Sequence, residues 1–288
     1  MVSITHLSQN FSSAFFRFSE LESAKCHLPN HASVVLKLMS SLYQGRVGVW
    51  MKFVSWNIAR RDAGVAALVE HLNPDIAFFQ ECKRPELLEV PGYQVVGKSI
   101  NERGRNQDWG NAIISKFPLH PVEIVSEYSG SLVCALAELP DGKTLGLVNI
   151  YGLLESSPMK PEVKVVHYGI HRMLSDVGFW LAQLEEPKVD GFIVGGDLNK
   201  DRRMDGGAGF KTGRSIASNL LNRFSDFGLV EADLEGATTF THSSSKSTWQ
   251  IDHIFLSEHL AKRTTARVVT IKGIDEHSDH SPIELISE

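Results

Sequence analysis

A short apolar run that ends in a carboxylate and a carboxamide is the feature of this sequence most suggestive of chemistry. Residues 191–196 read Gly-Phe-Ile-Val-Gly-Gly, which predicts a buried strand, and Asp197 and Asn199 follow two positions apart. Because strand side chains alternate in direction, both polar groups point the same way if the extended geometry persists. A capped turn explains the same residues equally well, so this segment alone predicts either a turn or a site.

Other apolar runs in the chain also end in polar groups that suit a metal ion or a phosphate. Each run predicts a strand, and the polar residues concerned are Asn57, Gln80, Glu81, Asn149, Tyr151 and Asp252, followed near the C-terminus by Asp279 and His280. Any one of them could be part of a turn or a satisfied core group. Their recurrence on separate strands predicts one rim at which strand ends converge.

Carboxylates gathered at such a rim require a cation. Glu81, Asp197, Asp252 and Asp279 would repel one another strongly without one. Carboxylate and carboxamide oxygens are hard donors, and no Cys–His ligand set accompanies them, which predicts Mg²⁺ or Mn²⁺ as the cofactor. Magnesium usually takes only one or two protein carboxylates, so Glu81 is the predicted ligand and Asn57 assists it directly or through a hydrogen bond.

The complete motif series resembles the endonuclease/exonuclease/phosphatase superfamily, which has the deoxyribonuclease-I-like fold. The matching segments run in family order over residues 51–288 and are Trp56-Asn57, Gln80-Glu81, Gly110-Asn111-Ala112-Ile113-Ile114-Ser115, Asn149-Ile150-Tyr151, Gly196-Asp197-Leu198-Asn199, Ile251-Asp252-His253 and Ser278-Asp279-His280-Ser281-Pro282. The resemblance implies an α/β (α+β) fold, in which helices flank two packed, mostly antiparallel or mixed sheets as a four-layer α/β/β/α sandwich.

The resemblance also implies catalytic roles. Asp197 would activate or orient an attacking water, and Asn199 would steady that water or the phosphate. His280 would donate to a phosphoryl oxygen while Asp252 holds its ring. Tyr151 would bind a phosphoryl oxygen or protonate the leaving group. The implied reaction is direct attack by water on a phosphate ester, without a covalent enzyme intermediate.

Four residues are predicted to contact the substrate. Asn111 belongs to the matching motif, Arg105 and Trp109 precede it, and Arg202 follows the segment that carries Asp197. Arginine and tryptophan near a phosphate site can grip a backbone and stack a base, although such loops are also ordinary solvated turns. Asp279 is predicted to be a second metal contact or a member of the same hydrogen-bond network.

Two departures from the abasic-site endonuclease branch bear on the substrate. Ala59 stands where that branch usually has an aspartate, and Gly152-Leu153-Leu154 replaces a segment that usually supplies a phosphate-positioning amide. Abasic-site repair is therefore not favoured. Inositol-phosphatase, sphingomyelinase and deadenylase branches usually carry histidine at the position of Tyr151, so they are not favoured either.

Composition indicates one large domain that contains the whole motif series. The net charge of −5 argues against a broad affinity for nucleic-acid backbones but allows a locally basic cleft. No apolar run is long enough to cross a bilayer, and no obligate protein partner is indicated. The three cysteines are too few and too scattered for a disulfide framework, which predicts a reducing, cytoplasmic location.

Hydrophobic spacing predicts three helices among many strands. One helix carries Val65, Leu68, Val69 and Leu72 and ends at Asn73-Pro74; a second starts near Pro161 and carries Ile170, Leu174, Val177, Leu181 and Leu184; a third spans Ser215–Phe227 and stops at Gly228. Further strands are predicted at 93–97, 111–115, 132–139 and 265–273. Few helices among many strands do not fit an alternating parallel fold.

Three functions remain open at this point. A metal-dependent phosphodiesterase acting on nucleic acid is favoured by Tyr151 and the basic loop residues. A phosphoesterase for a small or lipid substrate is favoured by the acidic net charge. A catalytically inactive binding module is the least favoured, because every residue assigned to water activation and phosphate binding is present.

The first fifty residues contain none of these motifs. Met51 opens directly onto the first predicted core strand, so residues 1–50 are either a genuine extension packed on the domain or an artefact of start-site choice. If they are an artefact, residues 51–288 expressed alone give a soluble domain that unfolds cooperatively on heating, measured by circular dichroism. An insoluble or unfolded product would contradict the artefact hypothesis.

Overall fold

Two six-stranded sheets form the centre of the domain in the computed structural model, which describes residues 51–100, 106–153, 155–156, 164–165, 167–182, 189–205, 216–273 and 275–287. The first sheet has the order β15 (Thr264–Val268), β16 (Ile283–Ser287), β1 (Met51–Asn57), β2 (Ile76–Cys82), β4 (Asn106–Ser115) and β3 (Tyr93–Ile100). The second has the order β11 (Leu229–Glu231), β14 (Asp252–Ser257), β10 (Gly191–Asp197), β7 (Thr144–Tyr151), β6 (Leu132–Glu138) and β5 (Leu119–Val122).

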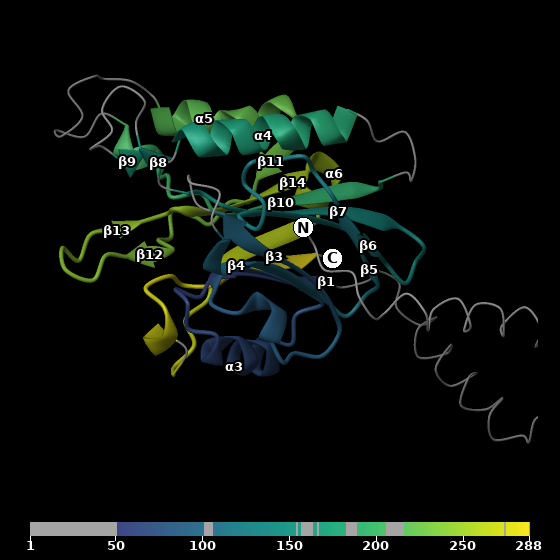
Figure 1. Cartoon of the computed structure of the whole chain (residues 1–288), viewed down its shortest axis with the longest axis horizontal. Coiled ribbons are helices and arrows are strands. Elements are labelled where there is room, and N and C mark those ends of the chain that lie inside the picture. Colours follow the sequence, from purple (N-terminus) through teal and green to yellow (C-terminus); the bar gives the residue numbers. More distant parts are fainter. Residues whose placement is uncertain are drawn as a thin grey trace, which may run out of the picture. The chain divides into compact units, whose positions relative to one another are not determined.

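Helices cover the outer faces of both sheets. Figure 1 shows α3 (Ala63–Leu72) on one side of the sheet pair and α4 (His167–Ala182) with α5 (Ile216–Asp226) on the other. This is the four-layer α/β/β/α sandwich that the resemblance implies. The remaining described elements are the short helix α6 (Glu258–Ala261), the 3-10 turns Pro85–Leu87, Arg202–Met204 and Asp275–His277, and two small ribbons formed by β8 (Glu155–Ser156) with β9 (Lys164–Val165) and β12 (Phe240–Thr241) with β13 (Thr248–Trp249).

The helices predicted from hydrophobic spacing are present. α3 ends where Asn73 turns left-handed with φ of 47°, and α5 is followed by Gly228 with φ of 72°. The start predicted near Pro161 for α4 lies outside the described residues. No helix in the described part of the chain is long and apolar enough to span a membrane.

Both sheets are mixed and mostly antiparallel, as the resemblance implies. β1 pairs in parallel with β2, and β7 with β10, while the other neighbouring strands run antiparallel. The strand predicted over 265–273 was too long, because β15 ends at Val268. Its partner β16 begins after Pro282, which has no N–H to continue the ladder, although the Pro282 carbonyl still accepts a bond from Val269.

Three apolar clusters hold the four layers together. The central cluster lies between the sheets, where the rings of Phe53 and Phe78 meet edge to face at 4.7 Å and pack with Leu147 and Ile193 of the second sheet. A second cluster places α4 and α5 on the second sheet, and a third places α3 on the first. Burial of these apolar side chains fixes which faces of the strands point inward, and therefore which edge receives the polar strand ends.

A buried polar network ties the two sheets together at that edge. The Gln80 side chain in β2 donates to Asn149 Oδ1 in β7 at 2.8 Å and to Ser55 Oγ at 3.2 Å. Asn149 in turn donates to the carbonyl oxygens of Phe79 and Ala112 at 3.0 and 2.9 Å. These hydrogen bonds connect the two sheets beneath the site, although Gln80 Oε1 has no hydrogen-bond partner among the described residues.

Gly196 lies against this network and provides a test of it. Its φ is 134°, and an added Cβ would lie 2.2 Å from the Ile150 carbonyl oxygen and 2.9 Å from Gln80 Nε2. We expect Gly196→Ala to lower the free energy of unfolding by about 2 kcal/mol or more, measured by urea denaturation. Gly236→Ala is the matched control, because its φ of 76° is also left-handed but no atom lies within 4 Å of the added Cβ. Equal losses in the two variants would contradict the clash.

Candidate active site

The ends of the two parallel strand pairs bring the motif residues to one edge of the sheets. Asn57 at the end of β1 lies opposite Gln80 in β2, and Tyr151 at the end of β7 lies opposite Asp197 at the end of β10. Asp252 lies opposite Asp197 across the antiparallel pair of β10 and β14. The convergence of strand ends predicted from the sequence is therefore found, although its members come from both sheets.

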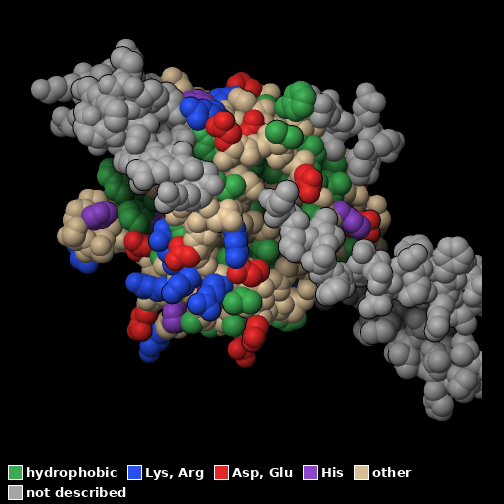
Figure 2. All heavy atoms as spheres, viewed as in Figure 1, with side chains coloured by type: hydrophobic (Ala, Val, Ile, Leu, Met, Phe, Trp, Pro, Cys, Tyr) green, Lys and Arg blue, Asp and Glu red, His purple; other side chains and the backbone are tan. Residues whose placement is uncertain are grey.

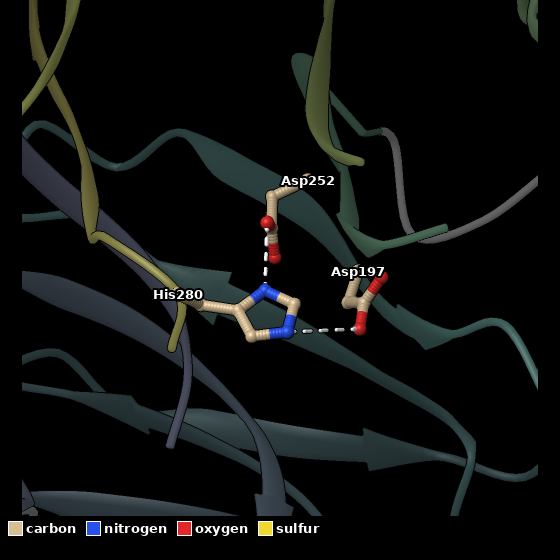
Figure 3. A group of neighbouring side chains, drawn as sticks. All are labelled: Asp197, Asp252 and His280. Atoms are coloured by element: carbon tan, nitrogen blue, oxygen red, sulfur yellow. Dashed lines mark hydrogen bonds and ion pairs between the residues drawn. The ribbon is translucent and has the colours of Figure 1, made fainter. Parts of the chain in front are cut away.

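His280 lies between the two aspartates. Figure 3 shows its ring with one nitrogen toward each carboxylate, where Nδ1 donates to Asp252 Oδ2 at 2.9 Å and Nε2 lies 3.8 Å from Asp197 Oδ2. All three side chains are buried. Asp252 was predicted inside a strand that began at Trp249, but it is the first residue of β14, because β13 ends at Trp249.

The two carboxylates change the protonation of His280. Burial by itself would lower the pKa of His280, but the charges of Asp252 and Asp197, and to a lesser extent of Asp279, raise it above its usual range. Burial raises the pKa of Asp197, partly offset by the positive charge of His280. A histidine in this setting is a protonated donor near neutral pH, and the aspartate facing it is a stronger base than an exposed one.

Two amides hold the Asp197 carboxylate. Asn57 Nδ2 donates to Asp197 Oδ2 at 2.8 Å, and the backbone N–H of Asn199 donates to Asp197 Oδ1 at 2.7 Å. The strand does not continue to Asn199 as the alternation of side chains requires, because Asn199 is left-handed with φ of 51°. Its side chain instead donates to the Gly152 carbonyl at 3.0 Å, with a weaker contact of 3.4 Å to Asp197.

Asn57 presents its N–H groups, not its oxygen, to the carboxylates. Its Oδ1 accepts a bond from the Ala59 backbone N–H at 2.9 Å, and its Nδ2 also reaches Glu81 Oε1 at 3.3 Å. Rotating the amide by 180° would set an oxygen against two carboxylates and an NH₂ group against an N–H. In this geometry Asn57 positions Glu81 and Asp197.

Glu81 is aimed into the site by an irregular backbone. It has a left-handed φ of 53° and lies where the register between β2 and β4 shifts. Bulges of this kind redirect side chains and are common beside active sites. Its side chain is 17% exposed, in contrast to the buried Asp197 and Asp252, so an ion from solvent can reach Glu81 more easily than either of them.

Tyr151 and Trp109 form an aromatic wall beside Glu81. Their rings meet edge to face with centroids 5.0 Å apart. Burial, followed by the charges of Glu81 and Asp197, raises the pKa of Tyr151 far above its usual range, so the phenol keeps its proton. The Arg60 guanidinium lies 5.2 Å above the Trp109 ring, and its Nε donates to Glu81 Oε2 at 3.2 Å.

The remaining predicted substrate contacts lie elsewhere. Asn111 is fully buried and donates to the Ser131 carbonyl at 3.0 Å, which also accepts the Tyr151 N–H, so Asn111 supports the backbone of Tyr151. Arg202 donates to Asn222 and Glu231 at 2.8 and 2.6 Å. Arg105 lies outside the described residues, and Asp279, predicted as a metal contact, is exposed beside His280.

Sequence patterns did not indicate two side chains that shape the site. Arg60 reaches it through two consecutive left-handed residues, since Ala59 and Arg60 have φ of 47° and 63°. Phe240 packs on the His280 ring at a centroid distance of 4.8 Å. The only sequence signal for Arg60 was a charged residue three positions after a motif asparagine.

The described residues include a group that could hold a metal ion. Ligand atoms of Asp197, Asp252 and His280 lie within 4.8 Å of one another. However, a protonated His280 has no free ring nitrogen for a metal, and Mg²⁺ prefers oxygen ligands. The donor chemistry therefore fits a hard divalent ion best at Glu81.

The chain belongs to the Endonuclease/Exonuclease/phosphatase family, whose model matches residues 54–280, and it is a phosphoric ester hydrolase. Among solved structures it is similar to the AP endonuclease LMAP from Leishmania major, with 18% identity, a TM-score of 0.62, and 83% of this chain and 88% of that chain covered. None of the curated proteins compared with the chain matches it.

Two further solved structures share the fold. The 3' phosphatase NExo from Neisseria, bound to product DNA hairpin, has 18% identity, a TM-score of 0.60, and 83% of this chain and 99% of that chain covered. The catalytic domain of APE2 from Xenopus laevis has 22% identity, a TM-score of 0.59, and coverages of 82% and 92%. At these identities the similarity establishes the architecture alone.

The contact between Asp252 and His280 predicts a specific change in titration. In Asp252→Asn the carboxylate that most stabilises the imidazolium is lost, so the pKa of His280 falls and its ring releases a proton at lower pH than in the unchanged protein. Nitrogen-15 chemical shifts of the His280 ring, followed across pH, measure this directly. Asp141→Asn, an exposed change in the turn between β6 and β7, is the control. An identical His280 titration in Asp252→Asn would contradict the assigned contact.

Proposed function

We propose that the protein is a divalent-metal-dependent phosphodiesterase that hydrolyses phosphodiester bonds of DNA or RNA by direct attack of water. The observation that carries this proposal is the pairing of a protonated His280, held by Asp252 through Nδ1, with the Asp197 carboxylate 3.8 Å from the other ring nitrogen. A base and a cationic donor this close together can act on the water and on a phosphoryl oxygen of the same ester.

Asp197 is the proposed general base. Asn57 and the Asn199 N–H orient its carboxylate, and burial raises its pKa, which makes it a better acceptor of a proton from water. The proton moves from the attacking water to a carboxylate oxygen of Asp197, and the water oxygen forms the new bond to phosphorus.

His280 is the proposed donor to the phosphoryl oxygens. His280 Nε2 is 3.8 Å from Asp197 Oδ2, too long for a hydrogen bond, so its N–H remains available to a phosphoryl oxygen that approaches from the side. Asp252 keeps the ring oriented and charged through Nδ1. Because negative charge grows on the phosphoryl oxygens in the transition state, a fixed cationic donor there lowers the barrier.

Tyr151 is the proposed donor to the leaving oxygen. Its raised pKa keeps the hydroxyl protonated throughout the working pH range, and the Trp109 ring fixes its orientation. In that role the phenolic O–H stabilises charge on the oxygen that departs from phosphorus.

Mg²⁺ or Mn²⁺ is the proposed cofactor, with Glu81 as its principal ligand. A bound divalent ion would neutralise charge on the phosphate group. Asn57 orients Glu81 by donating to its Oε1 at 3.3 Å. The exposed Asp279 carboxylate is the second proposed metal contact. The oxygen-rich donor set supports this choice of metal.

Nucleic acid is the proposed substrate class. The partly exposed Tyr151 ring lies next to Glu81, supported edge to face by the buried Trp109, and a base or sugar can pack on its exposed part. The loops that follow β1 and β2 expose Arg60, Arg61, Lys83 and Arg84, and Figure 2 shows Lys and Arg side chains gathered on the face that carries β4 and α3. One structural neighbour is bound to a product DNA hairpin, which agrees with this choice.

A small or lipid phosphate ester is the alternative substrate. The chain carries a net charge of −5, and acidic side chains lie among the basic ones in Figure 2. Arg202, one of the predicted substrate contacts, is already paired with Glu231. Such a surface of mixed charge gives a long polyanion less electrostatic attraction per phosphate than it gives a single phosphate group.

A substrate panel separates the two choices. We expect labelled single- and double-stranded DNA and RNA oligonucleotides to be cleaved with Mg²⁺ and to survive with excess chelator. Bis-p-nitrophenyl phosphate and phosphorylated metabolites form the comparison arm. Turnover of a small ester with no cleavage of any oligonucleotide would overturn the nuclease assignment and support the alternative.

Two substitutions test the proton-transfer roles. Asp197→Asn and His280→Ala should each lower kcat by about a hundredfold to ten-thousandfold, because each removes a group that acts only in the transition state. Circular dichroism should remain close to that of the unchanged protein. Unchanged rates in folded, purified variants would refute the assigned roles.

The proposed location is the cytoplasm. Cys82 and Cys134 are buried free thiols in the described part of the chain, which agrees with a reducing compartment.

A further inference from the structure

Arg60 is held beside the proposed metal ligand by its backbone. Its N–H donates to the Glu81 carbonyl at 3.0 Å, and the next residue, Arg61, donates to the Ile58 carbonyl at 2.9 Å. These bonds stabilise consecutive left-handed conformations at Ala59 and Arg60, which a chain rarely adopts without compensation. The loop therefore delivers the Arg60 side chain to a defined place.

Among the described residues the Arg60 side chain makes one hydrogen bond to the site, and it is half exposed. Nε donates to Glu81 Oε2 at 3.2 Å, while the guanidinium lies over Trp109 at 5.2 Å and the side chain is 49% exposed. Among the described residues Asn57 also donates to Glu81, reaching Oε1 at 3.3 Å. Arg60 differs from Asn57 in that it carries a positive charge.

A divalent ion at Glu81 and the Arg60 guanidinium compete for the same carboxylate. Both are cations and both are attracted to the Glu81 carboxylate. If both contacted it at once they would lie close together and repel each other. An exposed arginine–glutamate pair is weak, so an ion can displace it at small cost. The guanidinium then keeps its contact with the Trp109 face, on which it can pivot.

We propose that Arg60 is a metal-released substrate clamp, which pairs with Glu81 until a divalent ion binds there and then turns to a non-bridging oxygen of the substrate phosphate. This inference rests on the proposed function. The planar guanidinium can hold a phosphate through two parallel N–H bonds, and its contact with the Trp109 ring keeps it near Tyr151, the proposed donor to the leaving oxygen.

The first test measures metal binding without substrate. Arg60→Gln removes the competing charge, so calorimetric titration with Mg²⁺ should give binding about fivefold tighter than in the unchanged protein. Tryptophan emission should change as Mg²⁺ binds to the unchanged protein, because the guanidinium shifts over Trp109, and this change should be absent in Arg60→Gln. A residue that merely supported the loop would weaken metal binding when replaced.

Arg263→Gln is the matched control for both tests. It removes the same charge from an exposed arginine. Asp252 is the first residue of β14, whereas Arg263 comes after the last residue of β14 and after α6. Its Mg²⁺ affinity and its tryptophan response should equal those of the unchanged protein. Mg²⁺ binding in Arg60→Gln that is no tighter than in Arg263→Gln would overturn the competition.

The second test measures substrate binding without turnover. In an Asp197→Asn background with saturating Mg²⁺, fluorescence anisotropy of a labelled oligonucleotide should show about tenfold weaker binding when Arg60→Gln is added, since a charged hydrogen bond to phosphate is lost. Adding Arg263→Gln should leave the affinity within about twofold, because one distant exposed charge is screened by salt. Equal affinities in the two double variants would overturn the clamp.

These outcomes differ from those that test the proposed function. Cleavage of oligonucleotides by the unchanged protein tests the nuclease assignment, whereas both tests of Arg60 use binding alone. A protein that cleaves oligonucleotides but fails either Arg60 test keeps its function and loses the clamp.

Discussion

The site depends on two aspartates that the β-ladder places directly opposite each other. Asp197 and Asp252 are register partners in the antiparallel pair of β10 and β14, and both are buried. Like charges in that position destabilise a sheet, and burial makes the repulsion stronger. His280, which precedes β16 of the other sheet, supplies a positive charge that offsets part of this repulsion. The same three side chains connect the two sheets and include the proposed base and the proposed cationic donor.

A second set of contacts holds His280 in position between the two aspartates. Trp56 Nε1 donates to the His280 carbonyl at 2.9 Å, and Ser278 donates to the Asn57 carbonyl at 2.7 Å, so the C-terminal segment is fastened to the end of β1. Asn149 and Gln80 tie the sheets together beneath it. Rigid support of this kind holds catalytic groups within the small tolerances that proton transfer requires.

Backbone strain is concentrated around the same edge. Ala59, Arg60, Glu81 and Asn199 are all left-handed, and each either carries a site side chain or turns one toward the site. Such conformations persist where hydrogen bonds over-determine them, and they cluster at functional positions. Side chains at the end of a regular strand would alternate in direction. In this protein the left-handed residues turn several of them toward the site instead.

The sequence by itself determined the elements and the donor chemistry. Helix and strand periods are local, so α3, α5 and the strand ends at Asn57, Tyr151 and Asp197 followed from residue spacing, and carboxylates and amides follow from residue type. Only the tertiary structure decided which way those groups point: Asn57 turns N–H groups to the carboxylates, Asn111 is buried behind Tyr151, Arg202 pairs with Glu231, and Arg60 lies over Trp109. These outcomes depend on left-handed turns and on partners far apart in the chain, which no periodic pattern encodes.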